Sequence, residues 1–146
     1  MINWQIIASV FYIGRLPYAP GSWCSLIVLL FFSIFPLNIF LQLGIIISLI
    51  ILGFISSNIV SDQLNEKDPS FIVIDEAAGM ALALFLVPKS LILYIYSFLI
   101  FRFFDIFKPS FIYHVQRLPK GWGIMVDDII SGIITFIIIH LINIYI

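Results

Sequence analysis

The sequence has few charged residues and only one cysteine. Of its 146 residues, 10% are charged and 62% are hydrophobic, whereas a soluble domain carries roughly 25% charged residues. So few charges cannot easily cover a water-facing surface, and we expect much of the apolar surface to face lipid. The lone Cys24 excludes an intrachain disulfide and a thiolate metal site. The net charge of −1, without a basic run, argues against a nucleic-acid-binding surface.

Three apolar blocks, residues 26–60, 77–104 and 129–146, make up most of the chain. A proline interrupts each of the first two blocks, at Pro36 and at Pro88. Only the second half of the first block has the length of a full membrane span, about 20 residues. We expect the shorter pieces to be buried, interfacial or re-entrant.

Continuous apolarity within the blocks predicts helices, because a membrane β-barrel would need alternating apolar and polar residues. The sequence therefore predicts an all-α fold in one domain over residues 1–146. We expect a compact helical membrane protein with several apolar helices, some short or broken, and a polar site at the membrane interface. The N-terminus lacks the basic start and small-residue cleavage site of a signal peptide.

Charged residues collect between the apolar blocks. Apart from Arg15 and Lys89, all of them lie within residues 62–76 or 102–128. If these polar segments form one site, they lie on one side of the membrane, and the first two blocks must each turn back at their breaks. The lysines and arginines of residues 102–120 place that side in the cytoplasm.

The segment Tyr18-Ala-Pro-Gly-Ser-Trp23 combines a turn with the start of a helix. Ser22 is a suitable N-cap for that helix. A helix N-terminus exposes free N–H groups that suit a phosphate, and Arg15 would add a positive charge. An ordinary capped helix start is the alternative interpretation.

Two acidic pairs, Asp75-Glu76 and Asp127-Asp128, stand at the edges of apolar segments. Carboxylates in such surroundings are costly to desolvate unless they are paired or bind a metal. Their hard oxygen atoms suit Mg²⁺. The alternative is that each pair complements the dipole of a helix N-terminus, although two such pairs in one small apolar protein are hard to explain by capping alone.

A third group follows the second apolar block. Arg102, Asp105 and Lys108 are spaced three residues apart, so they share one face of a helix that we expect to stop near Lys108, before Pro109. Two cations beside one carboxylate could hold a phosphate next to a metal. An intrahelical ion-pair ladder that neutralises Asp105 is the alternative.

Together these segments resemble the phosphatidylglycerophosphatase A family. The matching stretches are APGSWCSL (19–26), DPSFIVIDEAAGMALAL (68–84), FRFFDIFKPSFI (101–112) and GWGIMVDDIISG (121–132). The resemblance implies an all-helical, multi-pass protein of the bacterial inner membrane, with its active site facing the cytoplasm. It also implies hydrolysis of phosphatidylglycerophosphate to phosphatidylglycerol and phosphate, with Mg²⁺ as cofactor and membrane phospholipid as the partner.

Carried over by position, the resemblance assigns the candidate site residues. The catalytic candidates are Asp75, Glu76, Asp105, Asp127 and Asp128. Among them, the candidate metal ligands are Asp75, Glu76, Asp105 and Asp128. Arg102 and Lys108 are the candidate phosphate-binding residues.

The hypothesis from the sequence is a metal-assisted phosphomonoester hydrolysis. The cations would stabilise the phosphate oxygens, and a spare carboxylate would act as general base; an aspartyl-phosphate route stays open. The Asp-x-Asp and Pro-Ser-Gly-His motifs of two other phosphatase classes are absent, as is the Asp-Gly-x-x-Ala-Arg motif of phosphatidyltransferases. The non-enzyme alternative is a small membrane transporter or scaffold, which predicts charges inside the spans.

Overall fold

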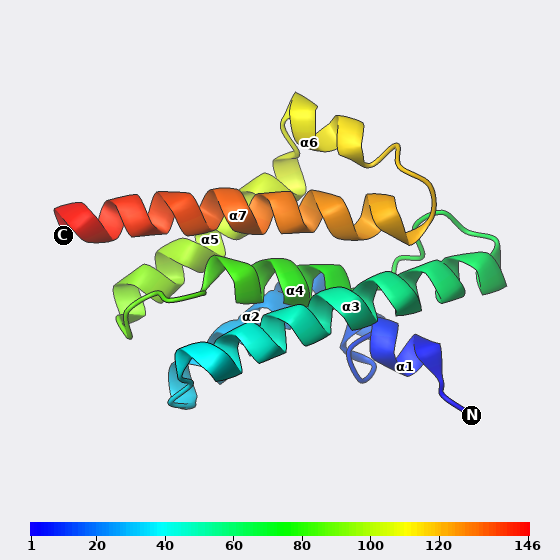
Figure 1. Cartoon of the computed structure of the whole chain (residues 1–146). Coiled ribbons are helices and arrows are strands. Elements are labelled where there is room, and N and C mark those ends of the chain that lie inside the picture. Colours follow the sequence, from blue (N-terminus) through cyan, green and yellow to red (C-terminus); the bar gives the residue numbers. More distant parts are fainter.

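The structure is a computed structural model that describes residues 1–146, and it contains helices and no strand (Figure 1). The all-α prediction is therefore confirmed. The helices are α1 (Trp4–Ala8), the 3-10 helix η1 (Ile13–Arg15), α2 (Pro20–Ile34), α3 (Ile39–Leu64), α4 (Ile74–Ala83), α5 (Leu91–Phe107), α6 (Ser110–Val115) and α7 (Gly121–Tyr145).

The helices alternate in direction along one long axis (Figure 1). Helices α2, α4 and α7 begin toward the same end of the molecule, and α3 and α5 run toward that end. The turns at residues 35–38 and 84–90 lie at the opposite end. Both apolar blocks therefore turn back where Pro36 and Pro88 interrupt them, as the sequence predicted. This arrangement brings the polar segments to one end, called the polar end below.

Local sequence signals explain several helix boundaries. The side chain of Asn38 accepts a hydrogen bond from the Leu41 amide at 2.9 Å and caps α3. Helix α2 starts at Pro20, whose missing N–H costs nothing at a first helical position. Helix α5 ends at Phe107, and Lys108 takes a left-handed conformation with φ of 42°. The predicted helix stop before Pro109 is confirmed.

Two predicted helix starts are wrong. Ser22 lies inside α2, and Ala19 precedes the helix without a side-chain cap. Helix α7 begins at Gly121, so the second acidic pair lies in its second turn and caps nothing. The Gly121 amide donates to Oδ1 of Asn58 at 3.0 Å, and a Cβ here would lie 2.7 Å from the Asn58 backbone nitrogen. Gly121 thus packs closely against α3 as the first residue of α7.

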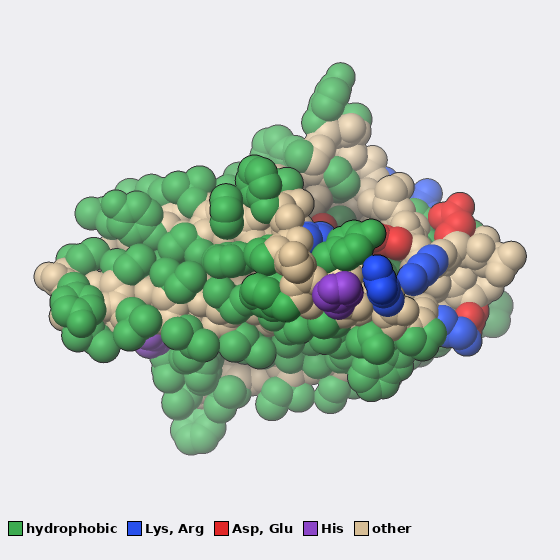
Figure 2. Space-filling view, turned by 90° about the horizontal axis from the view of Figure 1, so that it is seen from above, with side chains coloured by type: hydrophobic (Ala, Val, Ile, Leu, Met, Phe, Trp, Pro, Cys, Tyr) green, Lys and Arg blue, Asp and Glu red, His purple; other side chains and the backbone are tan.

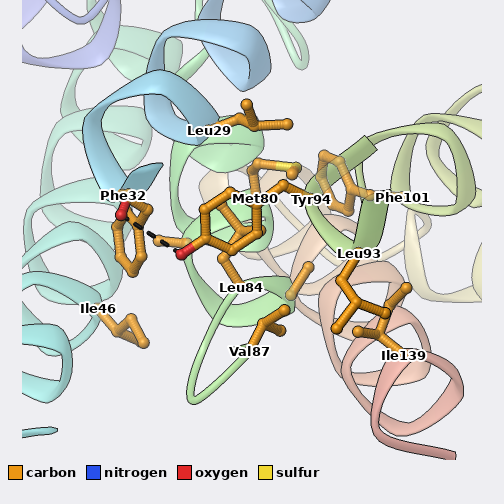
Figure 3. Close-up of a cluster of buried hydrophobic side chains, with 12 residues drawn as sticks. Leu29, Phe32, Ile46, Met80, Leu84, Val87, Leu93, Tyr94, Phe101 and Ile139 are labelled. Atoms are coloured by element: carbon orange, nitrogen blue, oxygen red, sulfur yellow. Dashed lines mark hydrogen bonds between the residues drawn. The ribbon is translucent and has the colours of Figure 1, made fainter. Parts of the chain in front are cut away.

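Helix α4 forms the centre of the fold, with seven of its ten residues buried. Met80 of α4 and Leu84, the residue after its end, pack in a cluster with Phe101 of α5 and Ile139 of α7 (Figure 3). The Tyr94 hydroxyl donates to the Phe32 carbonyl at 3.4 Å, which ties α5 to α2. This apolar core fixes the position of α4, whose first turn carries the first acidic pair.

Two helices, α3 and α7, are long and apolar enough to cross a membrane. Only 17% of the most apolar stretch of α3 is buried within the protein, whereas a core helix of a soluble protein is mostly buried. At about 1.5 Å per residue, its 26 residues exceed the thickness of a bilayer core. Hydrophobic side chains cover most of the face in Figure 2, and charges gather toward one end. The surface is consistent with membrane association.

Candidate active site

Three carboxylates from two helices meet at the polar end. Asp75 and Glu76 lie in the first turn of α4, and Asp128 lies in α7. One oxygen of each side chain lies within 4.8 Å of the others. Asp128 is only 1% exposed. Three acidic residues from segments more than 50 positions apart in sequence thus form one group, called the carboxylate cluster below.

A crossing of two glycines holds this cluster together. Gly79 lies one turn after Asp75, and Gly132 lies one turn after Asp128, so each glycine shares a helix face with its carboxylate. A Cβ on Gly79 would lie 2.6 Å from the Asp128 carbonyl oxygen, and a Cβ on Gly132 would collide with the Gly79 carbonyl. The backbones of α4 and α7 therefore touch, which sets the separation of their carboxylates. Small residues allow such close helix packing in membrane proteins.

Burial and mutual repulsion make negative charge on this cluster costly. Burial, and then the neighbouring charge of Glu76, raises the pKa of Asp75 well above the usual range of an aspartate. Oδ1 of Asp75, Oε2 of Glu76 and Oδ2 of Asp128 are buried and have no hydrogen-bond partner. Buried polar atoms are rarely left without a partner. Three such oxygens on hard carboxylate ligands are the donor set that a divalent cation such as Mg²⁺ requires.

A first cation lies beside the cluster. The Arg102 guanidinium forms an ion pair with Asp105 through Nη1, which is the alternative that their spacing on α5 had left open. The Asp105 carboxyl is close enough to Asp128 for the two negative charges to repel each other. Arg102 is close enough to Glu76 for their opposite charges to attract each other. The Arg102 Nε is buried and has no hydrogen-bond partner. This donor is therefore free to bind an anion next to the carboxylates.

The second cation, Lys108, pairs with Asp127 and not with Asp105. Lys108 follows the end of α5, and its Nζ lies 2.6 Å from Oδ2 of Asp127. Gln116 donates to the same oxygen at 3.0 Å, and Oδ1 of Asp127 accepts from the Asp128 amide at 2.9 Å. Although burial lowers it, the bond with Asp127 leaves the pKa of Lys108 above its usual value, so the lysine stays charged.

All seven candidate residues therefore lie in one neighbourhood, divided between a carboxylate cluster and two ion pairs. The sequence did not single out Gln116, because an isolated glutamine carries no motif signal. It also did not identify the glycine crossing. The small residues at positions 77–79 of an otherwise bulky apolar segment were the available signal for a close helix contact.

The start of α2 closes the site from a third side. A Cβ on Gly21 would collide with the Glu76 carboxyl and would lie 3.2 Å from Nη1 of Arg102. The positive end of the α2 dipole therefore faces the acidic and cationic groups. Arg15 lies elsewhere: its Nη2 donates to Oε1 of Gln5 at 3.0 Å, and its guanidinium stacks 5.1 Å from the Phe71 ring centroid.

Comparisons with known proteins agree with this arrangement. The model of the family described as phosphatidylglycerophosphatase A matches residues 6–143. The chain is 32% identical over 145 residues to phosphatidylglycerophosphatase A of Haemophilus influenzae, with 95% of this chain and 88% of the relative covered. It is 30% identical over 143 residues to phosphatidylglycerophosphatase A of Escherichia coli, with 96% and 83% covered.

A third relative carries a different name. A Bacteroides thetaiotaomicron protein, provisionally named phosphatidylinositol-3-phosphatase, is 31% identical over 143 residues, with 92% of this chain and 89% of the relative covered. No solved structure matches the chain. The range that the family model matches extends over almost the whole chain and spans the positions of the carboxylate cluster and its two ion pairs.

Proposed function

The chain belongs to the phosphatidylglycerophosphatase A family, and we propose that it removes the terminal phosphate of phosphatidylglycerophosphate with a Mg²⁺ ion held by the carboxylate cluster. The chain is thus a phosphatase of phosphatidylglycerol biosynthesis. The observation that carries the proposed site is the group of three buried carboxylates whose oxygens lack hydrogen-bond partners. Family membership favours the enzyme over a transporter or scaffold.

The names of the relatives point to two substrates with shared chemistry. Phosphatidylglycerophosphate and phosphatidylinositol 3-phosphate each carry one phosphate monoester and one phosphodiester. Two relatives are named for the first lipid and one for the second. The family model favours phosphatidylglycerophosphate as the substrate, and phosphatidylinositol 3-phosphate is the second candidate.

Asp75, Glu76 and Asp128 are the proposed metal ligands. When bound there, Mg²⁺ would neutralise phosphate charge and make water a better nucleophile. The cation would also offset the mutual repulsion of the three carboxylates, which burial otherwise makes costly. Asp105, a ligand candidate from sequence, lies next to this group and is already paired with Arg102.

The residues around the cluster would handle the phosphate and the proton. The free Nε of Arg102 would donate to a phosphate oxygen. Asp105 would take the proton of the attacking water as the bond from phosphorus to the leaving alcohol oxygen breaks. It would then release this proton to bulk water, from which the leaving alkoxide takes one to become the alcohol. Asp127 is a poor base, because Lys108, Gln116 and a backbone amide already occupy both of its oxygens. We assign Asp127 the task of holding Lys108 in place.

We place the protein in the bacterial inner membrane as a multi-pass protein, with the polar end facing the cytoplasm. Support comes from the lysines and arginines near that end, which the positive-inside rule assigns to the cytoplasm. The two apolar helices α3 and α7 would supply the spans. The acyl chains of the substrate would then stay in lipid while the headgroup reaches the cluster.

Phosphate release from phosphatidylglycerophosphate in detergent micelles tests this function. We expect turnover with Mg²⁺ and loss of turnover in EDTA, with recovery when Mg²⁺ is added back. Phosphatidylinositol 3-phosphate and phosphatidic acid serve as comparison substrates. Folded protein that releases no phosphate from any of these lipids would reject the phosphatase and restore the transporter or scaffold. Undiminished turnover in EDTA would reject the proposed Mg²⁺ requirement and leave the proposed phosphatase activity standing.

The close contact between α2 and Glu76 makes a further prediction. Gly21→Ala places a methyl group where the Glu76 carboxyl now lies, and we expect kcat to fall about tenfold to a hundredfold, because small displacements of catalytic groups are costly. Ser22→Ala, at the next residue, is the matched control and should retain activity, since its hydroxyl makes no hydrogen bond. Equal activity of the two variants would show that α2 does not position Glu76.

A further inference from the structure

A solvent-open pocket adjoins the catalytic centre on the side of α6. Its volume is about 230 Å³, and it is lined by Lys67, Asp68, Tyr113, Gln116, Arg117, Lys120, Gly123 and Ile124. No motif in the sequence marked it. Its lining contains three cations and one carboxylate, although the whole chain has a net charge of −1. This concentration of positive charge favours an anionic ligand.

Two of the pocket cations form no ion pair within the protein, although Asp68 lies next to Lys67 in the chain. Lys67 and Arg117 take part in no ion pair, whereas Lys120 lies 3.0 Å from Asp62. The charge of Lys120 is thus partly offset, and both members of that pair are 56% exposed. Lys67 and Arg117 are therefore the groups of this pocket that are free to bind an incoming anion.

The pocket is connected to the catalytic centre through shared residues. Gln116 lines the pocket and donates to Asp127 at 3.0 Å. Gly123 and Ile124 precede Asp128 on α7 by five and four residues, or about 6 to 7.5 Å along the helix axis. A short spacer such as glycerol would therefore reach from a phosphate at the carboxylate cluster to a second phosphate in the pocket.

The pocket wall depends on a close backbone contact. A Cβ on Gly123 would lie 2.7 Å from the Gln116 carbonyl oxygen and 2.8 Å from that of Leu118. The segment after α6 thus packs directly on α7 and brings Arg117 to the pocket rim. The exposed side chain of Tyr113 on α6 lines the pocket and offers apolar surface there, suited to the start of an acyl chain at a membrane interface.

Asp68 lies in the wall of the pocket. Its charge interacts with those of Lys108, Asp105 and Lys67. Its carboxylate repels a phosphate and accepts hydrogen bonds from a hydroxyl. In phosphatidylglycerophosphate, the glycerol between the two phosphates carries one free hydroxyl. The pocket cations, Asp68 and the catalytic cluster therefore offer partners for the diester, the hydroxyl and the monoester of that lipid.

We propose that this pocket binds the phosphodiester of the lipid substrate through Lys67 and Arg117, while the terminal phosphate occupies the carboxylate cluster. The proposal rests on the proposed function and adds to it the choice of substrate. A lipid with both a diester and a monoester fills both sites. Phosphatidic acid has only the monoester and leaves the pocket empty.

Steady-state kinetics and binding test the pocket separately from catalysis. For the Lys67→Gln/Arg117→Gln double variant, we expect the KM for phosphatidylglycerophosphate to rise about tenfold at nearly unchanged kcat. The Kd for short-chain phosphatidylglycerol, which keeps the diester and lacks the monoester, should rise by a similar factor in maltoside micelles. Short-chain diacylglycerol, without phosphate, is the blank. Lys120→Gln should have a smaller effect, because Asp62 already offsets its charge.

Lys89→Gln is the matched control, since it removes one cation at the far end of the molecule. If it raises KM as much as Lys67→Gln or Arg117→Gln, general attraction to anionic micelles explains the effect and the pocket proposal is wrong. Unchanged KM and unchanged Kd in the double variant also overturn it. Wild-type protein that binds phosphatidylglycerol through these residues but hydrolyses no lipid would instead reject the proposed function and keep the pocket.

Discussion

Asp128→Asn is expected to lower kcat on phosphatidylglycerophosphate about a thousandfold, equivalent to about 4 kcal/mol of lost transition-state stabilisation. The asparagine side chain keeps the size of Asp128 but removes one of the three charges that we propose to hold Mg²⁺. Because Asp128 is buried and its Oδ2 has no partner in the protein, no neighbouring group can replace it. Phosphate release in micelles at saturating Mg²⁺ gives the measurement.

Thermal unfolding separates this effect from a folding defect. In EDTA the variant should be at least as stable as wild type, because one of three crowded like charges is gone. Mg²⁺ should raise the Tm of wild type and not that of the variant. Glu66→Gln, an exposed carboxylate outside the cluster, is the control and should behave as wild type. More than a tenth of wild-type turnover in Asp128→Asn would mean that the cluster is not the metal site.

Gly132→Ala should produce the second-largest loss, about a hundredfold in kcat. The added methyl collides with the Gly79 carbonyl, so α7 must move away from α4. Because each glycine lies one turn from its carboxylate, this movement separates Asp128 from Asp75. A displacement of about 1 Å in a catalytic group costs on the order of a hundredfold in rate. Overpacking should also lower stability by about 1–3 kcal/mol.

Gly44→Ala gives the matched control for that experiment. Gly44 lies in α3 with no atom within 4 Å of a Cβ built on it, so the same chemical change meets open space there. We expect full activity and a slight gain in stability, because alanine is the better helix former. Gly79→Ala probes the opposite side of the crossing and should resemble Gly132→Ala. If Gly132→Ala and Gly44→Ala were equally active, the crossing would not control the site.

The sequence predicted features that depend on neighbouring residues. Pro36 and Pro88 marked the two turns, since proline is disfavoured in the interior of a helix. Pro109 likewise predicted the end of α5. The Arg102–Asp105 pair followed from helical spacing. Each of these features is set within a few residues of chain, so a reading of local pattern was sufficient.

Features set by packing between helices were not predictable in this way. Lys108 shares a helical face with Asp105 in sequence, but the chain leaves the helix at that residue and its ammonium group reaches Asp127, 19 positions away. Gly121 looks like a turn residue, yet contact with α3 makes it the first residue of α7. The pocket beside α6 combines a loop before α4 with a loop before α7, and no spacing rule connects the two.

The end of the molecule opposite the polar end carries none of the proposed site residues. The turn at residues 35–38 joins α2 to α3 away from the carboxylate cluster and its pocket, and Lys89 donates to the Phe35 carbonyl there at 2.7 Å. Nothing in the proposed chemistry depends on the length of that connection. For protein engineering, this turn is the place to insert an epitope or a fluorescent reporter, so that membrane sidedness can be mapped in an enzyme that still works.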